Sequence, residues 1–283
     1  MANEEGFVSP GSRDVDFVET RMGVLTWNIW WRFGPYDQRE PLIRNLLHDV
    51  NADILCLQEV WSSEQANQAA QLAQQLGLYY CYEPVLAIDG VDWGMAILSK
   101  WPVLESEGLV LPSMPSDDGS RDCKVMRARL DGPNGVVDVY NTHLSWRPDE
   151  SAIRQQQVKF IAELVKATWQ GPVPPIVCGD FNAIPTADEI RMMTGEAAVP
   201  VDGLYFFDAW RAAGHTDPGF TWDHANTLTR KALQPNRRLD YILVGEPADN
   251  AVGHILSAKR VGMQETDGVY PSDHFGVLAE LRY

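Results

Sequence analysis

The stretch Ile176-Val177-Cys178-Gly179-Asp180-Phe181-Asn182 decides how the chain is organised. A short apolar run ends at a glycine, and a carboxylate and an amide follow two residues apart. An apolar run with such bounds predicts a buried strand. Polar side chains at the exit of a strand lie above the sheet edge, which is where α/β folds place their chemistry. Asp180 and Asn182 are therefore candidate site residues.

A simpler interpretation is open for an isolated Gly-Asp-x-Asn stretch, in which the aspartate caps a turn and the asparagine accepts the bend. Four other ends of predicted strands carry similar polar groups. These are Asn28 after residues 24–27, Glu59 after residues 54–58, His143 after residues 136–142, and Ser272, Asp273 and His274 before the apolar run 275–278. Because these groups are mostly metal-ligand or acid/base types, packing alone does not explain the recurrence.

The composition is that of an ordinary soluble globular protein. The 283 residues are 45% hydrophobic and 22% charged, which allows one large α/β domain or two small ones. The net charge of −16 argues against tight non-specific binding to a nucleic-acid backbone, because that binding needs a basic surface. It does not exclude a small phosphate ester, since a divalent cation held by carboxylates brings its own positive charge. The sequence sets no oligomeric state.

The compartment is expected to be the cytoplasm. No apolar stretch approaches the roughly 18 to 20 residues of a transmembrane helix, and the start, Met1–Glu5, lacks the features of a signal peptide. The cysteines at positions 56, 81, 123 and 178 show no paired metal-binding spacing, so buried free thiols are expected.

The order of predicted elements indicates two sheets. Residues 1–18 form a predicted flexible tail, and residues 19–283 a single domain. Helical spacing of apolar residues predicts helices over 42–50, 66–76, 153–165 and near 187–193. Strands are predicted at 22–29, 53–60, 176–180, 239–244, 254–261 and 275–281, with an antiparallel stretch over 79–140. Because each half contains its own antiparallel part, sheets packed face to face with helices outside are favoured over one doubly wound sheet.

Three oxygen-bearing side chains could hold a hard cation. Mg²⁺ prefers oxygen ligands and keeps several waters, so it needs one or two carboxylates and an amide. Asn28, Glu59 and Asp273 supply such a set. Taken singly, Asn28 could close a turn and Glu59 could be a solvated strand end.

Two histidines at strand ends, His143 and His274, suit phosphoryl transfer. An imidazolium stabilises charge on non-bridging oxygens, and an imidazole moves a proton. Asp273 is adjacent to His274 and would point away from it on a strand, so the group that orients His274 should come from elsewhere. Asp240 is the candidate, because a lone carboxylate opening an apolar strand is costly unless it is paired.

Seven stretches, in order, resemble the endonuclease/exonuclease/phosphatase superfamily from about residue 22 to the C-terminus. They are Thr26-Trp27-Asn28, Leu57-Gln58-Glu59-Val60, Gly94-Met95-Ala96-Ile97-Leu98-Ser99, Asn141-Thr142-His143-Leu144, Gly179-Asp180-Phe181-Asn182, Arg238-Leu239-Asp240-Tyr241-Ile242 and Ser272-Asp273-His274. The resemblance implies a deoxyribonuclease I-like, four-layer α/β sandwich, with two packed mixed β-sheets flanked by helices and the site at their top.

The resemblance also implies roles for the catalytic residues. Asp180 would activate or position the attacking water, and Asn182 would hold the phosphoryl group or the nucleophile. His274 would stabilise charge on the phosphorane, with Asp240 behind it, and His143 would be the second histidine facing the phosphate.

For the cofactor, the resemblance implies Mg²⁺, or Mn²⁺ in its place, at Asn28, Glu59 and Asp273. One position departs from the abasic-site endonucleases, which carry a second acidic residue two positions after the motif asparagine. Here that position is Trp30, so chemistry with one metal or with two stays open.

The expected activity is hydrolysis of a phosphoester on a small-molecule or lipid-linked substrate, by in-line attack of water. Two alternatives remain: a DNA or RNA nuclease, which the acidic charge disfavours, and a non-catalytic interaction protein that retains the fold. Tryptophans beside the motifs serve either as packing or as an aromatic wall for a sugar, a base or a lipid-like group. They are Trp27, Trp30, Trp31, Trp61 and Trp146. Some of the basic residues near the motifs are expected to contact phosphate. They are Arg121, Lys124, Arg127, Arg147, Arg230, Lys231, Arg237 and Arg238.

Overall fold

The computed structural model describes residues 17–114 and 123–283. Most of the predicted tail, and Arg121, lie outside the described residues. Val18, at the end of that predicted tail, is bonded to the body of the protein: its N–H donates to Asn250 O at 3.1 Å, and Arg282 Nη1 donates to its carbonyl at 2.6 Å. None of the described helices combines the length and hydrophobicity that a bilayer span requires.

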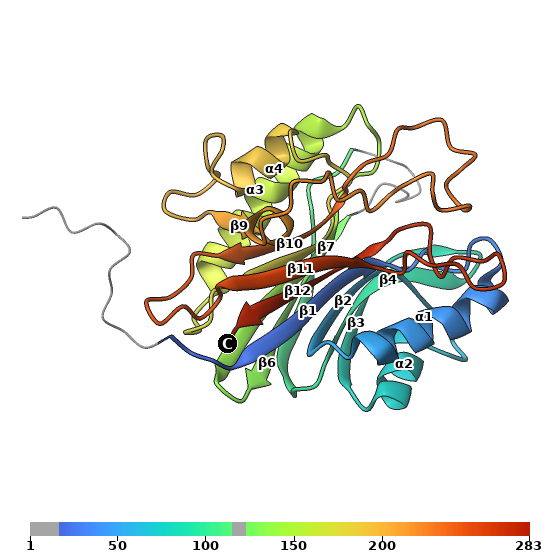
Figure 1. The fold of residues 1–283 in the computed structure, drawn as a ribbon, viewed down its shortest axis with the longest axis horizontal. Helices are drawn as coiled ribbons and strands as arrows, with labels where there is room; N and C mark the ends of the chain where they lie inside the picture. Colours follow the sequence, from blue (N-terminus) through green and yellow to red (C-terminus); the bar gives the residue numbers. More distant parts are fainter. Residues whose placement is uncertain (1–16, 115–122) are drawn as a thin grey trace, which may run out of the picture.

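Two six-stranded sheets form the centre of the protein (Figure 1). The first sheet has the order β11-β12-β1-β2-β4-β3 and the second β5-β6-β7-β8-β10-β9. The strands are β1 (Arg21–Asn28), β2 (Ile54–Ser62), β3 (Tyr79–Ile88), β4 (Val91–Ser99), β5 (Val103–Val110), β6 (Lys124–Gly132), β7 (Gly135–His143), β8 (Ile176–Asp180), β9 (Phe206–Asp208), β10 (Asp240–Gly245), β11 (Ile255–Val261) and β12 (Gly276–Arg282). The helices are α1 (Tyr36–Val50), α2 (Gln68–Leu76), α3 (Ser151–Thr168), α4 (Asp188–Met193) and α5 (Ala209–Ala212).

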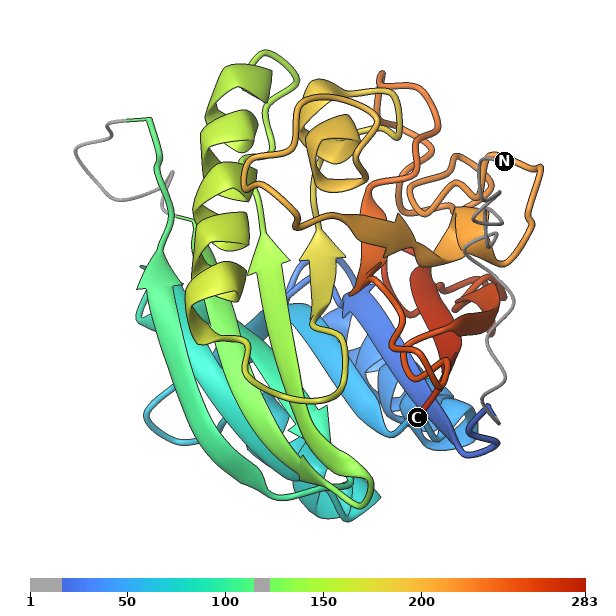
Figure 2. The same ribbon diagram turned by 90° about the vertical axis from the view of Figure 1, so that its left-hand side faces the viewer.

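Helices cover the outer face of each sheet, which gives four layers. Ile43 of α1 and Leu72 of α2 pack with the first sheet, and Ile161 of α3 packs with the second. Between the sheets lies a third apolar cluster that includes Val24 of β1 and Cys178 of β8. Figure 2 shows α3 lying across the outer face of the second sheet. The predicted four-layer α/β sandwich is confirmed.

Each sheet contains one parallel pair of strands, and these two pairs position the polar strand ends. β1 runs parallel to β2, with Asn28 opposite Gln58, and β7 runs parallel to β8, with His143 opposite Asp180. The antiparallel strand β10 begins opposite the end of β8, so Asp240 pairs with Asp180. Because parallel strands end at the same edge, polar groups far apart in sequence meet there.

The start of α1 differs from the sequence prediction. The helix begins at Tyr36 rather than near Leu42, because its first turns are polar and contain Pro41, so apolar periodicity does not mark them. Its end at Asn51 agrees with the prediction, as does the end of α2 at Gly77. Both residues adopt the left-handed conformation typical of helix ends, with φ of 48° and 69°.

Candidate active site

The glycine before Asp180 is required by a close approach of two strands. Gly179 has a φ of 150°, and a Cβ at this position would lie 2.0 Å from the carbonyl oxygen of Thr142 on the neighbouring strand. Only glycine fits such an approach without moving the backbone. The glycine that breaks the apolar run therefore holds β8 against β7 just before the carboxylate.

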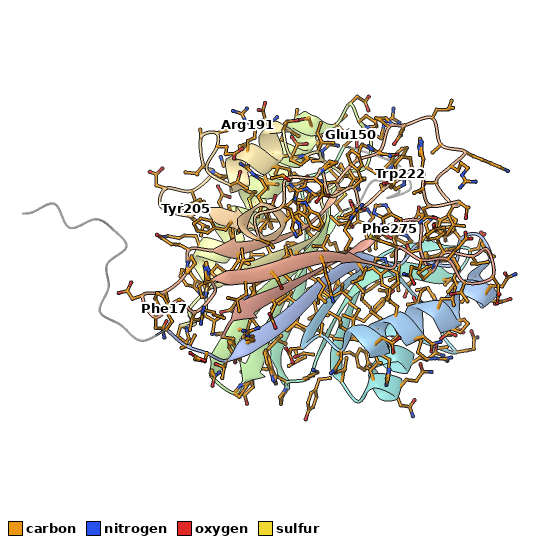
Figure 3. The ribbon with its side chains drawn as sticks, viewed as in Figure 1. Phe17, Glu150, Arg191, Tyr205, Trp222 and Phe275 are labelled. Carbon is orange, nitrogen blue, oxygen red and sulfur yellow. The ribbon has the colours of Figure 1, made fainter. Side chains whose placement is uncertain are left out.

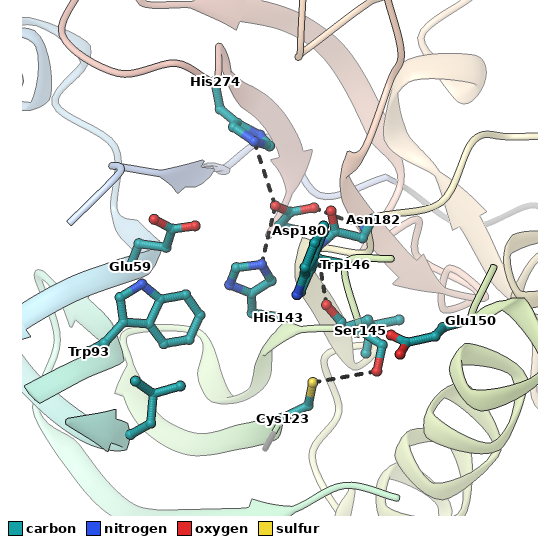
Figure 4. A pocket seen from close by; sticks show the side chains of 12 residues that line it. Glu59, Trp93, Cys123, His143, Ser145, Trp146, Glu150, Asp180, Asn182 and His274 are labelled. Atoms are coloured by element: carbon teal, nitrogen blue, oxygen red, sulfur yellow. Dashed lines mark hydrogen bonds and ion pairs between the residues drawn. The ribbon is translucent and has the colours of Figure 1, made fainter. Parts of the chain in front are cut away.

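Polar side chains from both sheets converge on Asp180 (Figure 4). Its Oδ2 lies 3.2 Å from Asn28 Nδ2, 3.5 Å from His143 Nε2 and 3.8 Å from His274 Nε2. Its Oδ1 accepts a hydrogen bond of 2.9 Å from the backbone N–H of Asn182. One carboxylate, almost fully buried, is thus surrounded by an amide and two imidazoles from three other segments of the chain.

His274 and Asp240 form a hydrogen-bonded pair next to Asp180. The imidazole Nδ1 lies 2.9 Å from Asp240 Oδ2, and both side chains are buried. Burial opposes the charged imidazolium, but Asp240 and Asp180 outweigh it and raise the pKa of His274 well above its usual value. The pair therefore fixes the ring and favours the protonated form, whose Nε2 faces Asp180.

Asn28, Glu59 and Asp273 offer oxygens beside this pair. Asn28 Nδ2 donates to Glu59 Oε1 at 2.9 Å, and Glu59 Oε2 is buried without a hydrogen-bond partner in the described part of the chain. Desolvation raises the pKa of Asp273 to about 7, and Glu59 adds to the rise while His274 opposes it. Glu59 thus raises the pKa of Asp273 and carries an oxygen without a hydrogen-bond partner among the described residues, and such a pair of carboxylates fits a hard cation such as Mg²⁺.

Asp180, Asp240 and His274 form a second group of ligand-type side chains. One atom each from Asp180, Asp240 and His274 lies within 4.8 Å of the others. Within this group, however, the His274 Nδ1 already bonds Asp240. The placement of a cation at Asn28, Glu59 and Asp273 stays a prediction.

Glu59 owes its direction to an irregularity in the strand. The register between β2 and β4 shifts between Gln58 and Val60, and Glu59 has a φ of 56°. A bulge of this kind turns a side chain away from the regular alternation of a strand. A left-handed φ is uncommon for glutamate and costs energy, so the surrounding structure must hold it in place.

A buried amide pair joins the two sheets beneath the site. Gln58 Nε2 on β2 donates to Asn141 Oδ1 on β7 at 2.7 Å, and Asn141 Nδ2 donates to the carbonyl oxygens of Leu57 and Ala96 at 2.9 and 3.0 Å. Both side chains are fully buried, so these bonds are made in a low-dielectric interior. The pair fixes the spacing between the sheets and thus between Glu59 and His143, which follow Gln58 and Asn141 by one and two residues.

Arg39 holds the loop after Asn28. Although fully buried, its guanidinium donates to five backbone carbonyls at 2.9 to 3.2 Å. Desolvation lowers its pKa to about 10. The accepting residues are Ile29, Trp30, Trp31, Phe33 and Pro271. Sequence reasoning missed Arg39, because a single arginine in a polar stretch carries no pattern.

Replacing Arg39 with methionine is expected to lower the free energy of unfolding by about 3 kcal/mol or more, because several carbonyls lose their donor. Urea denaturation measures this change. Arg44→Met is the matched control on the same helix, since Arg44 is part-exposed and its 3.8 Å ion pair with Glu40 contributes little. Equal losses in the two variants would contradict the assigned role of Arg39.

A cavity of about 340 Å³ opens beside Asp180. The cavity is lined by Glu59, Leu86, Trp93, Cys123, His143, Leu144, Ser145, Trp146, Glu150, Asp180, Asn182 and His274. Asn182, at φ 49°, donates its side-chain amide to Leu144 O at 3.1 Å, so its role toward a phosphoryl group stays a prediction.

Of the five tryptophans named from the sequence, Trp146 lines this cavity. Trp27 is buried and donates to His274 O at 2.9 Å, which makes it part of the scaffold. Trp93, missed from the sequence, lies 5.0 Å from the His143 ring. Its position directly before the motif that begins at Gly94 could have identified it.

Arg237, a basic residue named from the sequence, interacts electrostatically with Asp180. Burial lowers the pKa of Arg237 and Asp180 opposes the decrease, while the guanidinium stacks 5.0 Å over the Trp222 ring. Figure 3 shows Trp222 at the same end of the sheets as Glu150 and Phe275. By contrast, Arg238 is held in a buried 2.7 Å ion pair with Asp208.

Solved structures share this fold. A truncated TDP2 from Caenorhabditis elegans is 23% identical and superposes with a TM-score of 0.69, covering 95% of this chain and 100% of that one. TDP2 from D. rerio, in complex with a single-stranded DNA product, is 18% identical with a TM-score of 0.73, covering 94% and 100%.

Sequence relatives extend the likeness. Human nocturnin is 24% identical over 285 residues, covering 95% of this chain, and sphingomyelin phosphodiesterase 5 of Danio rerio is 24% identical over 166 residues, covering 50%. The chain spans 61% of the length of the first and 30% of the second. The model of the Endonuclease/Exonuclease/phosphatase family matches residues 25–274. The chain belongs to that family.

Proposed function

We propose that the protein is a divalent-metal-dependent hydrolase of phosphoester bonds that acts by in-line attack of water. The observation that carries the proposal is the convergence of Asn28, His143 and His274 on one carboxylate oxygen of Asp180. A carboxylate held this way has a fixed orientation in which it can bind the attacking water, and the donors around it face the position of a phosphoryl group. Family membership supports phosphoester chemistry.

Each catalytic side chain has a task that its contacts support. Asp180 orients the attacking water and takes its proton. Asp240 holds His274 in position and favours its protonated form. His274 then donates from Nε2 to a non-bridging oxygen on which charge accumulates. His143 Nε2 faces the same space from the second sheet, and Asn182 closes it.

Asn28, Glu59 and Asp273 would hold Mg²⁺, with Mn²⁺ as the alternative. When bound, the cation would polarise the phosphoryl group and neutralise part of its charge. The structural feature that supports this assignment is Glu59 Oε2, which is buried and has no hydrogen-bond partner among residues 17–114 and 123–283.

The substrate is proposed to be a small or lipid-linked phosphoester. The net charge of −16 opposes a polynucleotide, and one relative is named for its action on sphingomyelin, a phosphodiester. A nuclease is the second candidate, favoured by the structural likeness to a TDP2 that was solved with a single-stranded DNA product.

The test is hydrolysis of a generic aryl phosphodiester and the matching monoester, with and without Mg²⁺, by the wild type and His274→Ala. The proposal predicts turnover that depends on the cation and is abolished in the variant. The preference between the two esters separates phosphodiesterase from phosphatase. Turnover that does not depend on the cation would contradict the proposal. So would a protein that cleaves none of these esters, nucleic acids or phospholipids.

Glu59→Gln is expected to raise the dissociation constant for Mg²⁺ by at least about 10-fold, because the cation loses a charged ligand. Calorimetric titration of Mg²⁺ into the protein measures this without relying on activity. Glu64→Gln, an exposed glutamate in the loop after β2, is the control and should bind Mg²⁺ like the wild type. Unchanged affinity in Glu59→Gln would remove Glu59 from the cation site.

A further inference from the structure

The proposed cation ligands Asn28 and Asp273 lie on two segments that strand pairing does not hold together. β1 and β12 run antiparallel, and their last backbone pair toward the site is Thr26 with Val277. Asn28 lies two residues beyond Thr26, and Asp273 lies four residues before Val277. The separation of the two ligands therefore depends on contacts other than the pairing of these strands.

One guanidinium nitrogen joins the two segments. Arg39 Nη1 donates to the carbonyl oxygens of Ile29 and Pro271 at 3.0 and 2.9 Å. Ile29 directly follows Asn28, and Pro271 lies two residues before Asp273. Because the guanidinium is planar and Nη1 carries one hydrogen for each acceptor, the two carbonyls are held at a fixed separation.

Another nitrogen of Arg39 holds the loop after Asn28 in a strained conformation. Trp30 and Trp31 have left-handed φ values of 57° and 35°, which are costly for bulky residues. Arg39 Nη2 donates to their carbonyl oxygens at 2.9 and 3.0 Å. The backbone N–H of Trp30 in turn donates to Asn28 Oδ1 at 3.0 Å, so the shape of this loop sets the direction of the Asn28 amide.

Ser272 makes a second link between the same segments. Its buried Oγ donates to the carbonyl oxygen of Asn28 at 2.7 Å and accepts from the backbone N–H of His274 at 3.2 Å. The same Oγ lies 3.4 Å from Asp273 Oδ1. Because Asp273 lies between Ser272 and His274 in the chain, this hydroxyl fixes the backbone around Asp273 relative to Asn28.

The charge of Arg39 and its hydrogen bonds act on a cation in opposite directions. Burial lowers the pKa of Arg39, and the negative charges of Asp273 and Glu59 oppose the decrease, so the guanidinium interacts with both carboxylates. A fixed positive charge there repels Mg²⁺. Ligands that are held in place, by contrast, bind a metal more tightly than mobile ones. The direction of the change on removing Arg39 therefore distinguishes the two contributions.

We infer that Arg39 and Ser272 are positioning residues for the cation site, because they fix the segment that carries Asn28 against the segment that carries Asp273. The inference rests on the proposed function, which places Mg²⁺ at Asn28, Glu59 and Asp273. Both positioning residues act through the backbone beside a ligand and do not bind the cation themselves. They hold the ligand segments in place before the cation binds, which lowers the cost of binding it.

The test is calorimetric titration of Mg²⁺ into the folded wild type, Arg39→Gln, Arg39→Lys and Ser272→Ala. Each variant is expected to raise Kd for Mg²⁺ by about 10- to 100-fold, the usual cost of losing a group that orients a metal ligand. Lysine keeps the positive charge but replaces the planar fork by one nitrogen, so Arg39→Lys reports the geometry alone. Arg44→Gln on α1 and Ser257→Ala, at an exposed position of β11, are the matched controls and should bind Mg²⁺ like the wild type.

Hydrogen–deuterium exchange without Mg²⁺ measures the order of the two segments independently of binding. Residues 29–33 and 271–274 are both expected to exchange faster in Arg39→Gln and in Ser272→Ala, whereas residues 176–180 of β8 should exchange at the wild-type rate. Thermal melts establish which variants are folded. Ser272→Ala removes one hydroxyl and leaves the buried guanidinium in place, so it decides the inference where an Arg39 variant does not fold.

The outcomes separate this inference from the proposed function. Wild-type Mg²⁺ affinity and wild-type exchange in the folded variants would overturn the inference and leave the proposed function intact. Tighter binding in Arg39→Gln with unchanged binding in Arg39→Lys would assign the effect to charge alone, and would also overturn it. A wild type that binds neither Mg²⁺ nor Mn²⁺ would count against the cation site of the proposed function and overturn the inference with it.

Discussion

Replacing Asp180 with asparagine is expected to lower kcat by about 10²- to 10⁴-fold, the usual contribution of a general base. Asparagine keeps the size of the side chain, and its one amide oxygen can still accept the hydrogen bond from the Asn182 backbone, while its amide nitrogen replaces the oxygen that faces Asn28. It cannot take a proton from water. The loss should therefore fall on the chemical step, which single-turnover kinetics with saturating Mg²⁺ measures.

The loss of activity in Asp180→Asn is informative only if the variant is folded like the wild type. Asp180 lies at the end of β8 within a dense set of contacts, so the melting temperature and circular dichroism of the variant must match the wild type. Asp188→Asn, at the exposed start of α4, is the matched substitution and should leave kcat unchanged. A folded Asp180→Asn protein with nearly full activity would remove Asp180 from the reaction.

His274→Gln is expected to lower kcat by about 10²- to 10³-fold, the usual cost of losing one donor to developing negative charge. Asp240→Asn should cost less, because Asp240 acts only through His274 by fixing the ring at 2.9 Å. The double variant should be about as slow as His274→Gln alone, since residues that act as a unit are strongly non-additive.

The double-mutant cycle for this pair uses kcat of the wild type, the two single variants and the double variant. Glutamine at position 274 keeps a donor near the buried Asp240, which limits the loss of stability. Thermal melts verify that all four proteins are folded. Multiplicative effects in the double variant would mean that Asp240 contributes independently, and would contradict the orienting role.

The sequence predicted the strands and the polar residues at their ends where the local pattern of apolar and polar residues matches the position of the segment in the fold. The apolar run before Asp180 predicted β8, and the strand-end polar groups predicted which side chains meet, because strand order brings their ends to one edge. The proximity of Asp240 to His274 could be anticipated from the cost of an unpaired carboxylate at the start of an apolar strand. The four-layer architecture followed from the order of helices and strands together with the resemblance.

Other features depend on contacts that sequence spacing does not encode. Arg39 donates to backbone carbonyls, which every residue carries. The side chains of the accepting residues therefore do not identify them as its partners. Trp30 and Trp31 adopt left-handed φ values of 57° and 35°, a conformation rare for bulky residues and imposed by that loop. The sorting of tryptophans between scaffold and cavity depends on burial, which separates Trp27 from Trp146 although both flank a motif.

The central claim is that water attacks phosphorus at Asp180 in a cation-dependent reaction. The most direct measurement is hydrolysis of an aryl phosphodiester in oxygen-18-labelled water with Mg²⁺, followed by mass spectrometry of both products. We predict that the label enters the phosphate-bearing product, that the alcohol stays unlabelled, that labelling stops without the cation, and that it is about 10²- to 10⁴-fold slower in Asp180→Asn. Label in the alcohol, labelling that persists without Mg²⁺, or labelling at the wild-type rate in the variant would contradict this claim.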